Sequence, residues 1–280
     1  MRARVGFPLS MPKYIARDTG YPPIPPYLVQ PGQQKKFCAV CGEVYAAGDM
    51  PRLLLLSNSR NPGCGYMEHA LPWLDEFLAP RCTVAFVPWA AVTVAWDAYE
   101  TKVVEAFEAI GRTVESVHHG DNPAATLGDA GAIAVGGGNT FQLLEHLRKT
   151  GALTAIRQRV EAGVPYIGWS AGSNVASPTI CTTNDMPIVD PGGFEALGLV
   201  SYQINPHYTN ERIPNHGGEA RDDRIAEFLA ANPEATVLAL PEGTAVHVDG
   251  DRHVLLGEKP ARMVRNGLEA VLLAPGKLML

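Results

Sequence analysis

The sequence predicts a three-layer α/β/α fold with a mostly parallel central sheet, followed by several short strands at the C-terminal end. Three observations predict it. From Met50 onward, short apolar runs alternate with amphipathic segments, the apolar runs end in turn residues or glycines, and no internal repeat is visible. Repeated strand–helix units favour a parallel sheet with helices on both faces.

The expected elements follow one another along the chain. The main strands are Arg52–Ser59, Thr83–Trp89, Ala132–Thr140 (which runs into glycines), Pro165–Ser170 and Thr236–Gly243. The helices are Met67–Leu78, Ala95–Ile110, a segment ending near Lys149, Leu153–Ala162 and Gly218–Ala230. The short C-terminal strands are Ala245–Val248, His253–Leu256, Ala261–Val264 and Ala270–Leu273. Active sites in such sheets form at the carboxyl ends of strands. The candidate active-site loops are therefore those after Ser57, at Gly136–Asn139 and at Ser170.

Residues 1–49 differ in composition from the rest of the chain. They are rich in proline and glutamine and lack helical or strand periodicity, which predicts a flexible N-terminal extension preceding one compact domain over residues 50–280. Cys38 and Cys41 have zinc-knuckle spacing, but no second Cys/His pair follows at a usable distance. We therefore interpret them as incidental thiols and expect no metal.

Composition and charge exclude several classes of protein. Of 280 residues, 46% are hydrophobic and 19% charged, which is typical of a globular protein, and the net charge of -6 includes no block of Lys or Arg. Nucleic acid and membrane are therefore not expected as partners. Five scattered cysteines do not resemble a disulfide framework, and neither a secretory signal nor a membrane-spanning stretch is visible. A cytoplasmic location is expected.

The motif Gly-Trp-Ser-Ala-Gly around Ser170 matches the nucleophile elbow G-x-S-x-G. In such an elbow a sharp strand-to-helix turn lifts the serine oxygen into a cleft, and the glycines prevent clashes with the adjoining elements. The helix that begins at Ala171 directs free N–H groups toward the serine, so the N–H of Ala171 is a candidate oxyanion donor.

A second oxyanion donor is expected from the glycine-rich run Val135–Thr140. Gly137 or Gly138 is the candidate, with Asn139 capping the next helix or contacting substrate. The run lacks the Gly-Lys-Ser/Thr of a phosphate-binding P-loop and the spacing of a dinucleotide-binding motif. No nucleotide cofactor is therefore expected.

A serine hydroxyl needs a base to take its proton. His207 is the strongest candidate, because it follows a short strand-like run (Ser201–Ile204) and lies among turn residues. An acidic partner must then fix the imidazole tautomer. Spacing alone does not choose among the three candidates, which are Asp185, Asp190 and Glu242.

Six segments in order resemble the peptidase E (α-aspartyl dipeptidase) family. They are LLLLSNS, VGGGNTFQLL, YIGWSAGSN, TTNDMPIVDPGGFEALGL, QINPHYTN and LPEG, and the similarity runs from about Met50 nearly to the C-terminus. The resemblance implies a glutamine amidotransferase-like fold in which serine replaces the cysteine nucleophile. It also implies hydrolysis of small peptides of the form Asp-Xaa without metal or other cofactor.

The resemblance also implies roles for individual residues. Ser170 would attack the carbonyl, His207 would transfer the proton, and Asp185 would be the third member of the triad, with Glu242 as the alternative acid. Arg221 matches a position on the helix after His207 where a guanidinium would bind the substrate's carboxylate. Related enzymes of this fold act on cyanophycin-type or N-acyl amino acid substrates.

Two other interpretations remain open at this level. An α/β-hydrolase esterase shares the elbow and the order Ser, Asp, His, although its histidine usually comes much later in the chain. A non-catalytic protein could retain the fold, but an intact serine, histidine and acid set argues against it. The sequence is compatible with a monomer or a homodimer.

Overall fold

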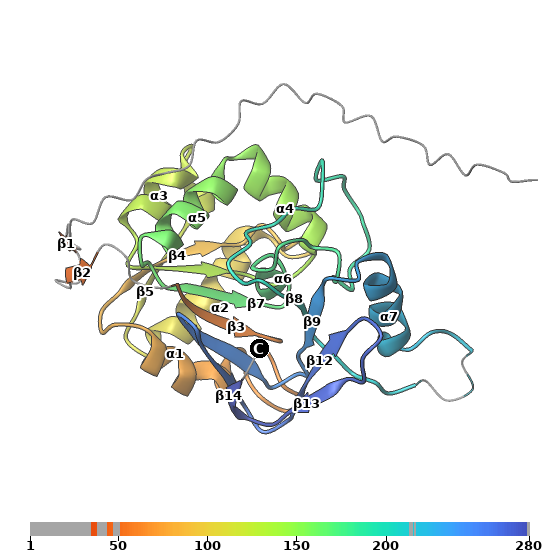
Figure 1. Cartoon of the computed structure of the whole chain (residues 1–280). Helices are drawn as coiled ribbons and strands as arrows, with labels where there is room; N and C mark the ends of the chain where they lie inside the picture. Colours follow the sequence, from red (N-terminus) through yellow and green to blue (C-terminus); the bar gives the residue numbers. More distant parts are fainter. Residues whose placement is uncertain (1–34, 38–43, 47–50, 213–214, 216, 279–280) are drawn as a thin grey trace, which may run out of the picture. The chain divides into compact units, whose positions relative to one another are not determined.

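The computed structural model describes residues 35–37, 44–46, 51–212, 215 and 217–278 (Figure 1). The first two segments are strands β1 (Lys35–Phe37) and β2 (Val44–Ala46), which pair antiparallel. Most of the predicted 1–49 extension lies outside the described residues, as do Cys38 and Cys41. The division of the chain into residues 1–49 and 50–280 therefore stays a prediction.

Strands and helices alternate from residue 52 onward. The strands are β3 (Arg52–Leu56), β4 (Thr83–Val87), β5 (Thr113–Ser116), β6 (Ala132–Val135), β7 (Tyr166–Trp169), β8 (Gln203–Asn205), β9 (Thr236–Ala239), β10 (Ala245–Asp249), β11 (Arg252–Leu256), β12 (Ala261–Arg265), β13 (Val271–Leu273) and β14 (Gly276–Leu278). The α-helices are α1 (Leu71–Phe77), α2 (Trp96–Glu108), α3 (Pro123–Asp129), α4 (Thr140–Lys149), α5 (Ala152–Glu161), α6 (Ala171–Asn174) and α7 (Arg221–Ala231). The 3₁₀ turns are η1 (Glu68–Ala70) and η2 (Val117–His119).

The larger sheet has eight strands in the order β14-β11-β10-β3-β7-β6-β4-β5. The five strands from β3 to β5 in this order are parallel, and β10, β11 and β14 extend the sheet with antiparallel pairing. Gly168 of β7 is in register with both Leu55 of β3 and Val135 of β6. The loops that follow β3, β6 and β7 therefore leave the sheet side by side, as the sequence predicts for the candidate site.

Each face of this sheet is covered by helices, which confirms the predicted three-layer arrangement (Figure 1). Leu53 and Leu55 pack into one core with residues of α4 and α5, whereas Leu54 and Leu56 pack into the other with residues of α1 and α2. Alternate side chains of a strand point to opposite faces, so a strand buried on both faces needs a continuous apolar run. The four consecutive leucines of β3 satisfy this requirement.

A second, smaller sheet has the order β13-β12-β9-β8. The sequence did not separate β9 from the strands of the large sheet, but β9 pairs parallel with β8, with Asn205 opposite Ala239. Because the two strand ends are adjacent, the segments that follow them are also adjacent. These segments carry His207 and Glu242.

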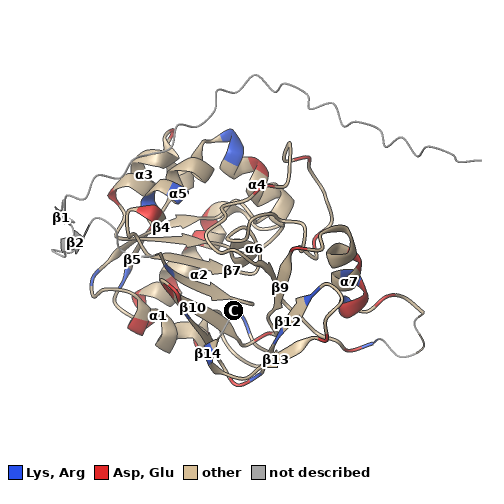
Figure 2. Ribbon diagram, viewed as in Figure 1, with Lys and Arg blue, Asp and Glu red and all other residues tan. Residues whose placement is uncertain are grey.

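Charged residues lie mainly on helices and loops, whereas β4, β6 and β7 contain none (Figure 2). Blue and red segments are interspersed along the ribbon in the same view. In the part of the chain that the structure describes, no helix is long and apolar enough to cross a membrane.

Candidate active site

Ser170 occupies a strained turn between β7 and α6. Its φ and ψ angles are 54° and -113°, outside the regions that residues with a Cβ atom normally adopt. Three backbone hydrogen bonds hold the turn: Ser170 N donates to Leu56 O at 3.1 Å, and the Ser170 carbonyl accepts from Ser173 N and Asn174 N. The surrounding structure thus over-determines this conformation, as is typical of a functional site.

The two glycines of the elbow are required by close backbone contacts. A Cβ atom on Gly168 would lie 2.4 Å from the Gly172 carbonyl oxygen, and a Cβ atom on Gly172 would lie 2.0 Å from the Val135 carbonyl oxygen. Helix α6 therefore approaches β6 and β7 more closely than any side chain would allow. This geometry confirms the sequence interpretation of Gly-Trp-Ser-Ala-Gly as a nucleophile elbow.

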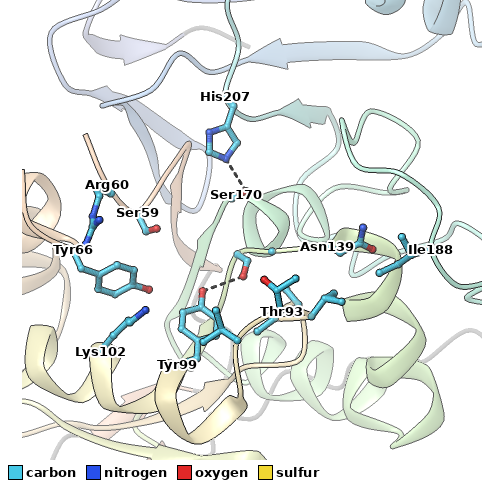
Figure 3. Close-up of a pocket in the computed structure, with 16 residues that line it drawn as sticks. Ser59, Arg60, Tyr66, Thr93, Tyr99, Lys102, Asn139, Ser170, Ile188 and His207 are labelled. Atoms are coloured by element: carbon cyan, nitrogen blue, oxygen red, sulfur yellow. Dashed lines mark hydrogen bonds between the residues drawn. The ribbon is translucent and has the colours of Figure 1, made fainter. Parts of the chain in front are cut away.

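His207 bridges the serine and a carboxylate. Its Nε2 lies 2.8 Å from Ser170 Oγ and its Nδ1 lies 2.8 Å from Glu242 Oε1 (Figure 3 shows the contact with Ser170). A carboxylate only accepts hydrogen bonds, so Nδ1 carries the hydrogen and Nε2 is left to accept the serine proton. His207 also has a positive φ of 54°, so both partners of the Ser–His contact are in strained conformations.

The structure places Glu242, rather than Asp185, in contact with His207. The imidazole of His207 has only two nitrogens, and Ser170 and Glu242 occupy both. Asp185 instead accepts hydrogen bonds from Thr140 N at 2.7 Å and Thr140 Oγ1 at 2.6 Å. It thereby caps the N-terminus of α4 and anchors its own loop. Asp190, the third candidate, is exposed and accepts a hydrogen bond from Gly192 N.

Two polar residues that the sequence reasoning did not select position the histidine and the glutamate. Ser57 Oγ accepts from His207 N at 2.9 Å while donating to Leu240 O at 2.8 Å. Asn58 Oδ1 accepts from the N–H of Gly243, next to Glu242. Both are buried directly after β3. The available signal was the abrupt change from leucines to Ser-Asn at this strand end, which drew attention to the loop but gave neither residue a role.

Backbone N–H groups beside Ser170 are available to an oxyanion. Within the described residues, the N–H groups of Ala171, Gly137 and Gly138 donate to no other group. Gly138 has a φ of +142°, and a Cβ atom there would lie 2.1 Å from the Ala90 carbonyl oxygen. Gly137 packs directly against the serine, because its Cβ atom would lie 2.9 Å from Ser170 Cβ. The predicted glycine loop therefore lies where an oxyanion donor is needed.

Tyr99 fixes the peptide that carries the Gly138 N–H. Its buried hydroxyl donates to the Gly137 carbonyl oxygen at 3.1 Å and accepts from Trp169 Nε1 at 2.8 Å. In a planar trans peptide, the C=O and the following N–H point in opposite directions. Holding the Gly137 carbonyl therefore also sets the direction of the Gly138 N–H. Burial raises the pKa of Tyr99, so the hydroxyl keeps its proton for this bond.

Ser170 and His207 line a cavity of about 590 Å³. Figure 3 shows Arg60, Tyr66 and Lys102 on one side of it and Asn139 and Ile188 on the other. Among the described residues that line it, Arg60 and Lys102 are the cations. The cavity thus combines a reactive hydroxyl with positive charge, as a site for a small anionic substrate requires.

The two predicted substrate-binding residues have different positions. Asn139 lines the cavity, and its side chain caps α4 by accepting from Gln142 N at 3.1 Å while donating to Met186 O. Arg221 lies instead in a separate hollow with Asn184 and Asp185, and its guanidinium donates to Asn184 Oδ1. The structure therefore does not bring Arg221 into the cavity of Ser170.

A serine on a strained elbow, a histidine held by a carboxylate and free backbone N–H groups beside the serine, at the carboxyl ends of the strands of an α/β sheet, define a serine hydrolase. Within this class, the model of peptidase family S51 matches residues 53–256. The chain belongs to this family.

Known proteins agree with this assignment. The chain is 49% identical over 224 residues to peptidase E of Salmonella heidelberg and, at the same identity, to peptidase E of Citrobacter koseri; each match covers 80% of this chain and 98% of the relative. A solved candidate peptidase E protein from Listeria monocytogenes is 27% identical, with a TM-score of 0.57, over 74% of this chain and 98% of that one. A peptidase from an acI-B1 actinobacterium shares the fold, with a TM-score of 0.64 at 16% identity.

Proposed function

We propose that the chain is a cytoplasmic serine dipeptidase that hydrolyses Asp-Xaa through an acyl-enzyme. Membership of peptidase family S51 and the 49% identity to proteins named peptidase E support it. The single observation that carries the mechanism is the position of the His207 ring, 2.8 Å from both Ser170 Oγ and Glu242 Oε1.

The first half of the reaction forms an ester. Ser170 Oγ attacks the carbonyl carbon of the aspartyl residue while its proton moves to His207 Nε2, and Glu242 stabilises the resulting imidazolium. The carbonyl oxygen becomes an oxyanion that accepts hydrogen bonds from the N–H groups of Ala171 and Gly138. When the tetrahedral intermediate collapses, the C–N bond breaks and His207 gives its proton to the leaving amine of Xaa.

The second half releases aspartate. Water replaces the departed amino acid and loses a proton to His207 as it attacks the ester carbonyl. The same two N–H groups hold the second oxyanion. The C–O bond to Ser170 then breaks, and His207 returns the proton to the serine oxygen. Each step uses only the side chains and backbone groups already in place.

Substrate selection is proposed to rest on the cavity wall. Arg60 and Lys102 supply positive charge for the carboxylates of Asp-Xaa, and charge-assisted hydrogen bonds are the stronger kind. Val92, Val94 and Ile188, which are 52%, 38% and 50% exposed, also line the cavity. They offer an apolar surface to the side chain of Xaa. Arg221, in its separate hollow, is assigned no direct contact with the substrate.

The order of the proposed triad argues against an α/β-hydrolase esterase. In that class the acid precedes the histidine. With Glu242 as the acid, the order here is Ser170, His207, Glu242, and the last two residues follow strands of the smaller sheet. Cyanophycin-type and N-acyl amino acid substrates are alternatives within the same fold, and the experiment below separates them.

Release of chromophore from an aspartyl anilide tests the proposal. We expect activity in the wild type and a loss on the order of 10⁴–10⁶-fold in kcat for Ser170→Ala, as for other triad serines. Exposed Ser201 provides a matched control, and Ser201→Ala should keep full activity. Glutamyl, asparaginyl, succinyl, cyanophycin-type and short acyl ester substrates complete the panel. Full activity in Ser170→Ala, or faster hydrolysis of the acyl ester than of the aspartyl amide, would refute the proposal.

A further inference from the structure

Four side chains with metal-ligating atoms converge away from the Ser170 cavity. Asp97 and Glu100 lie in the first turns of α2, and His118 and His119 lie in η2, directly after β5. One donor atom from each lies within 4.8 Å of the donors of the other three. The i, i+3 spacing places both carboxylates on one side of the helix, and no residue of the four lines the cavity.

His118 lies between Ser116 and Asp97. Its Nδ1 is 2.5 Å from Ser116 Oγ, which is also 3.2 Å from Phe86 O, and its Nε2 is 2.8 Å from Asp97 Oδ1. When Ser116 Oγ donates to Phe86 O it accepts from Nδ1–H, and Nε2 then offers its lone pair to a metal ion beside the Asp97 carboxylate.

The second pair repeats this arrangement. His119 Nε2 lies 2.5 Å from Glu100 Oε2, while Glu100 Oε1 accepts from Ser116 N at 3.1 Å. The two imidazole rings lie with their centroids 4.0 Å apart, so one ion can reach a nitrogen of each ring and an oxygen of each carboxylate.

The inner members of the group are oriented in advance. The side chains of His118 and Glu100 are 8% and 16% exposed, and each is held by Ser116 through its remaining polar atom. Outer hydrogen bonds of this kind fix the tautomer and direction of metal ligands. Asp97 and His119 are 82% and 55% exposed, which leaves a path from solvent.

We propose that Asp97, Glu100, His118 and His119 bind a divalent transition-metal ion, with Zn²⁺ the best match. Two imidazole nitrogens and two carboxylate oxygens suit tetrahedral Zn²⁺, whereas Ca²⁺ and Mg²⁺ prefer oxygen ligands alone. Metal–ligand bonds of about 2.0–2.1 Å place the donors of a tetrahedral site about 3.3 Å apart. Because the four donor atoms already lie within 4.8 Å of one another, small side-chain rotations bring them to this spacing. Four protein ligands leave no open position, which makes the site structural.

Such an ion would join the start of α2 to η2. Helix α2 also carries Tyr99, which holds the Gly137 carbonyl, and Lys102, which lines the cavity. The ion therefore braces one wall of the cavity from outside. It takes no part in the reaction at Ser170.

Metal binding by the full chain is the direct test. We would titrate Zn²⁺ against a chromogenic chelator in mildly alkaline buffer, and record Co²⁺ spectra to separate nitrogen and oxygen ligation from thiolate ligation by Cys38 and Cys41. The variant Asp97→Asn/His119→Gln changes only the two exposed ligands and leaves the inner pair in place. Asp121→Asn, which removes an exposed carboxylate from the same region, is the control.

We expect one tetrahedral Co²⁺ site without thiolate charge-transfer absorption in wild type and in Asp121→Asn. In the double variant, affinity for Zn²⁺ should fall on the order of 10–100-fold or more. Zn²⁺ should also raise the unfolding temperature of wild type but not of the double variant. Equal Zn²⁺ affinity in wild type and double variant, no saturable binding, or spectra of thiolate ligation alone would overturn the proposal. Hydrolysis by Ser170 is assayed separately and does not affect these outcomes.

Discussion

Glu242 Oε1 lies 2.8 Å from Nδ1 of His207, although the two residues are 35 positions apart in the chain. The contact forms because β8 and β9 are parallel neighbours and each side chain follows the end of its strand. Ser57 and Asn58, which follow β3, hold the two segments by accepting hydrogen bonds from the backbone N–H groups of His207 and Gly243. Glu242 and His207 are thus placed by the smaller sheet, and Ser170 by the larger one.

This contact predicts different outcomes for the two candidate acids. In Glu242→Gln the amide can present its NH₂ to Nδ1, which favours the wrong imidazole tautomer, so kcat should fall by about 10²–10⁴-fold with little change in KM. Asp185→Asn instead weakens the cap of α4, which should lower the unfolding temperature while kcat falls less than tenfold. Steady-state kinetics and thermal melts on both variants measure this. A larger kcat loss in Asp185→Asn than in Glu242→Gln would contradict the assignment.

Tyr99→Phe tests the alignment of the oxyanion donor. Removing the hydroxyl leaves buried Trp169 Nε1 without its acceptor and releases the Gly137 carbonyl. We expect a stability loss of about 1–3 kcal/mol. We also expect kcat to fall roughly tenfold, because a misdirected Gly138 N–H weakens transition-state binding. Chemical denaturation and kcat measured on the same preparation give both values.

A purely structural role for Tyr99 would lower the fraction of folded enzyme without altering kcat per active site. Active-site titration with a serine-directed phosphonate separates the two cases. Unchanged kcat per titrated site would remove Tyr99 from the alignment of the oxyanion donor.

Lys102 and Arg221 give opposite predictions for substrate binding. Lys102 lines the cavity, so Lys102→Gln should raise KM for Asp-Xaa about tenfold or more. A change of this size corresponds to the loss of one charge-assisted hydrogen bond. Arg221 lies in the other hollow, so Arg221→Gln should change KM less. Comparing an aspartyl with an alanyl substrate in both variants identifies the carboxylate partner. A selective loss for aspartyl substrates in Arg221→Gln alone would reinstate the role that the resemblance implied.

Local patterns in the sequence predicted most of the large sheet and the elbow. Short-range packing explains the leucine run of β3, the glycines on either side of Ser170 and the glycine loop after β6. Each of these requirements is visible in a short stretch of the sequence. β5 (Thr113–Ser116) and α3 (Pro123–Asp129) were missed. β5 is an edge strand with exposed or half-buried residues over most of its length, and α3 is short, so neither has a strong apolar period.

The choice between Asp185 and Glu242 could not be made from sequence because it depends on strand pairing. Whether a carboxylate meets Nδ1 of His207 is decided by the parallel alignment of β8 with β9, which spacing does not encode. Arg221 illustrates the same limit: a matching position on a helix does not determine which hollow the side chain enters. The sheet partners of an element, rather than its own residues, decide these contacts.

Stability should fall in mild acid because of half-buried histidines. Burial lowers the pKa of His69 and of His247. His69 packs edge-on against Trp73 and His247 against Phe77, and neither ring nitrogen of His69 nor Nε2 of His247 has a hydrogen-bond partner among the described residues. Burial therefore disfavours the charged form of both rings in the folded state, and on His69 the additional proton would also have no protein acceptor among the described residues.

The sign of the effect follows from proton binding. Since the folded pKa values lie below the ordinary value of about 6.5, the unfolded chain binds more protons as pH falls through that value. The contribution of neutral His69 and His247 is complete above about pH 6.5 and is lost as the pH falls through the window below it. Urea unfolding at a series of pH values should show this loss, and His69→Gln/His247→Gln should flatten it. If the double variant keeps the wild-type slope, other groups carry the pH dependence.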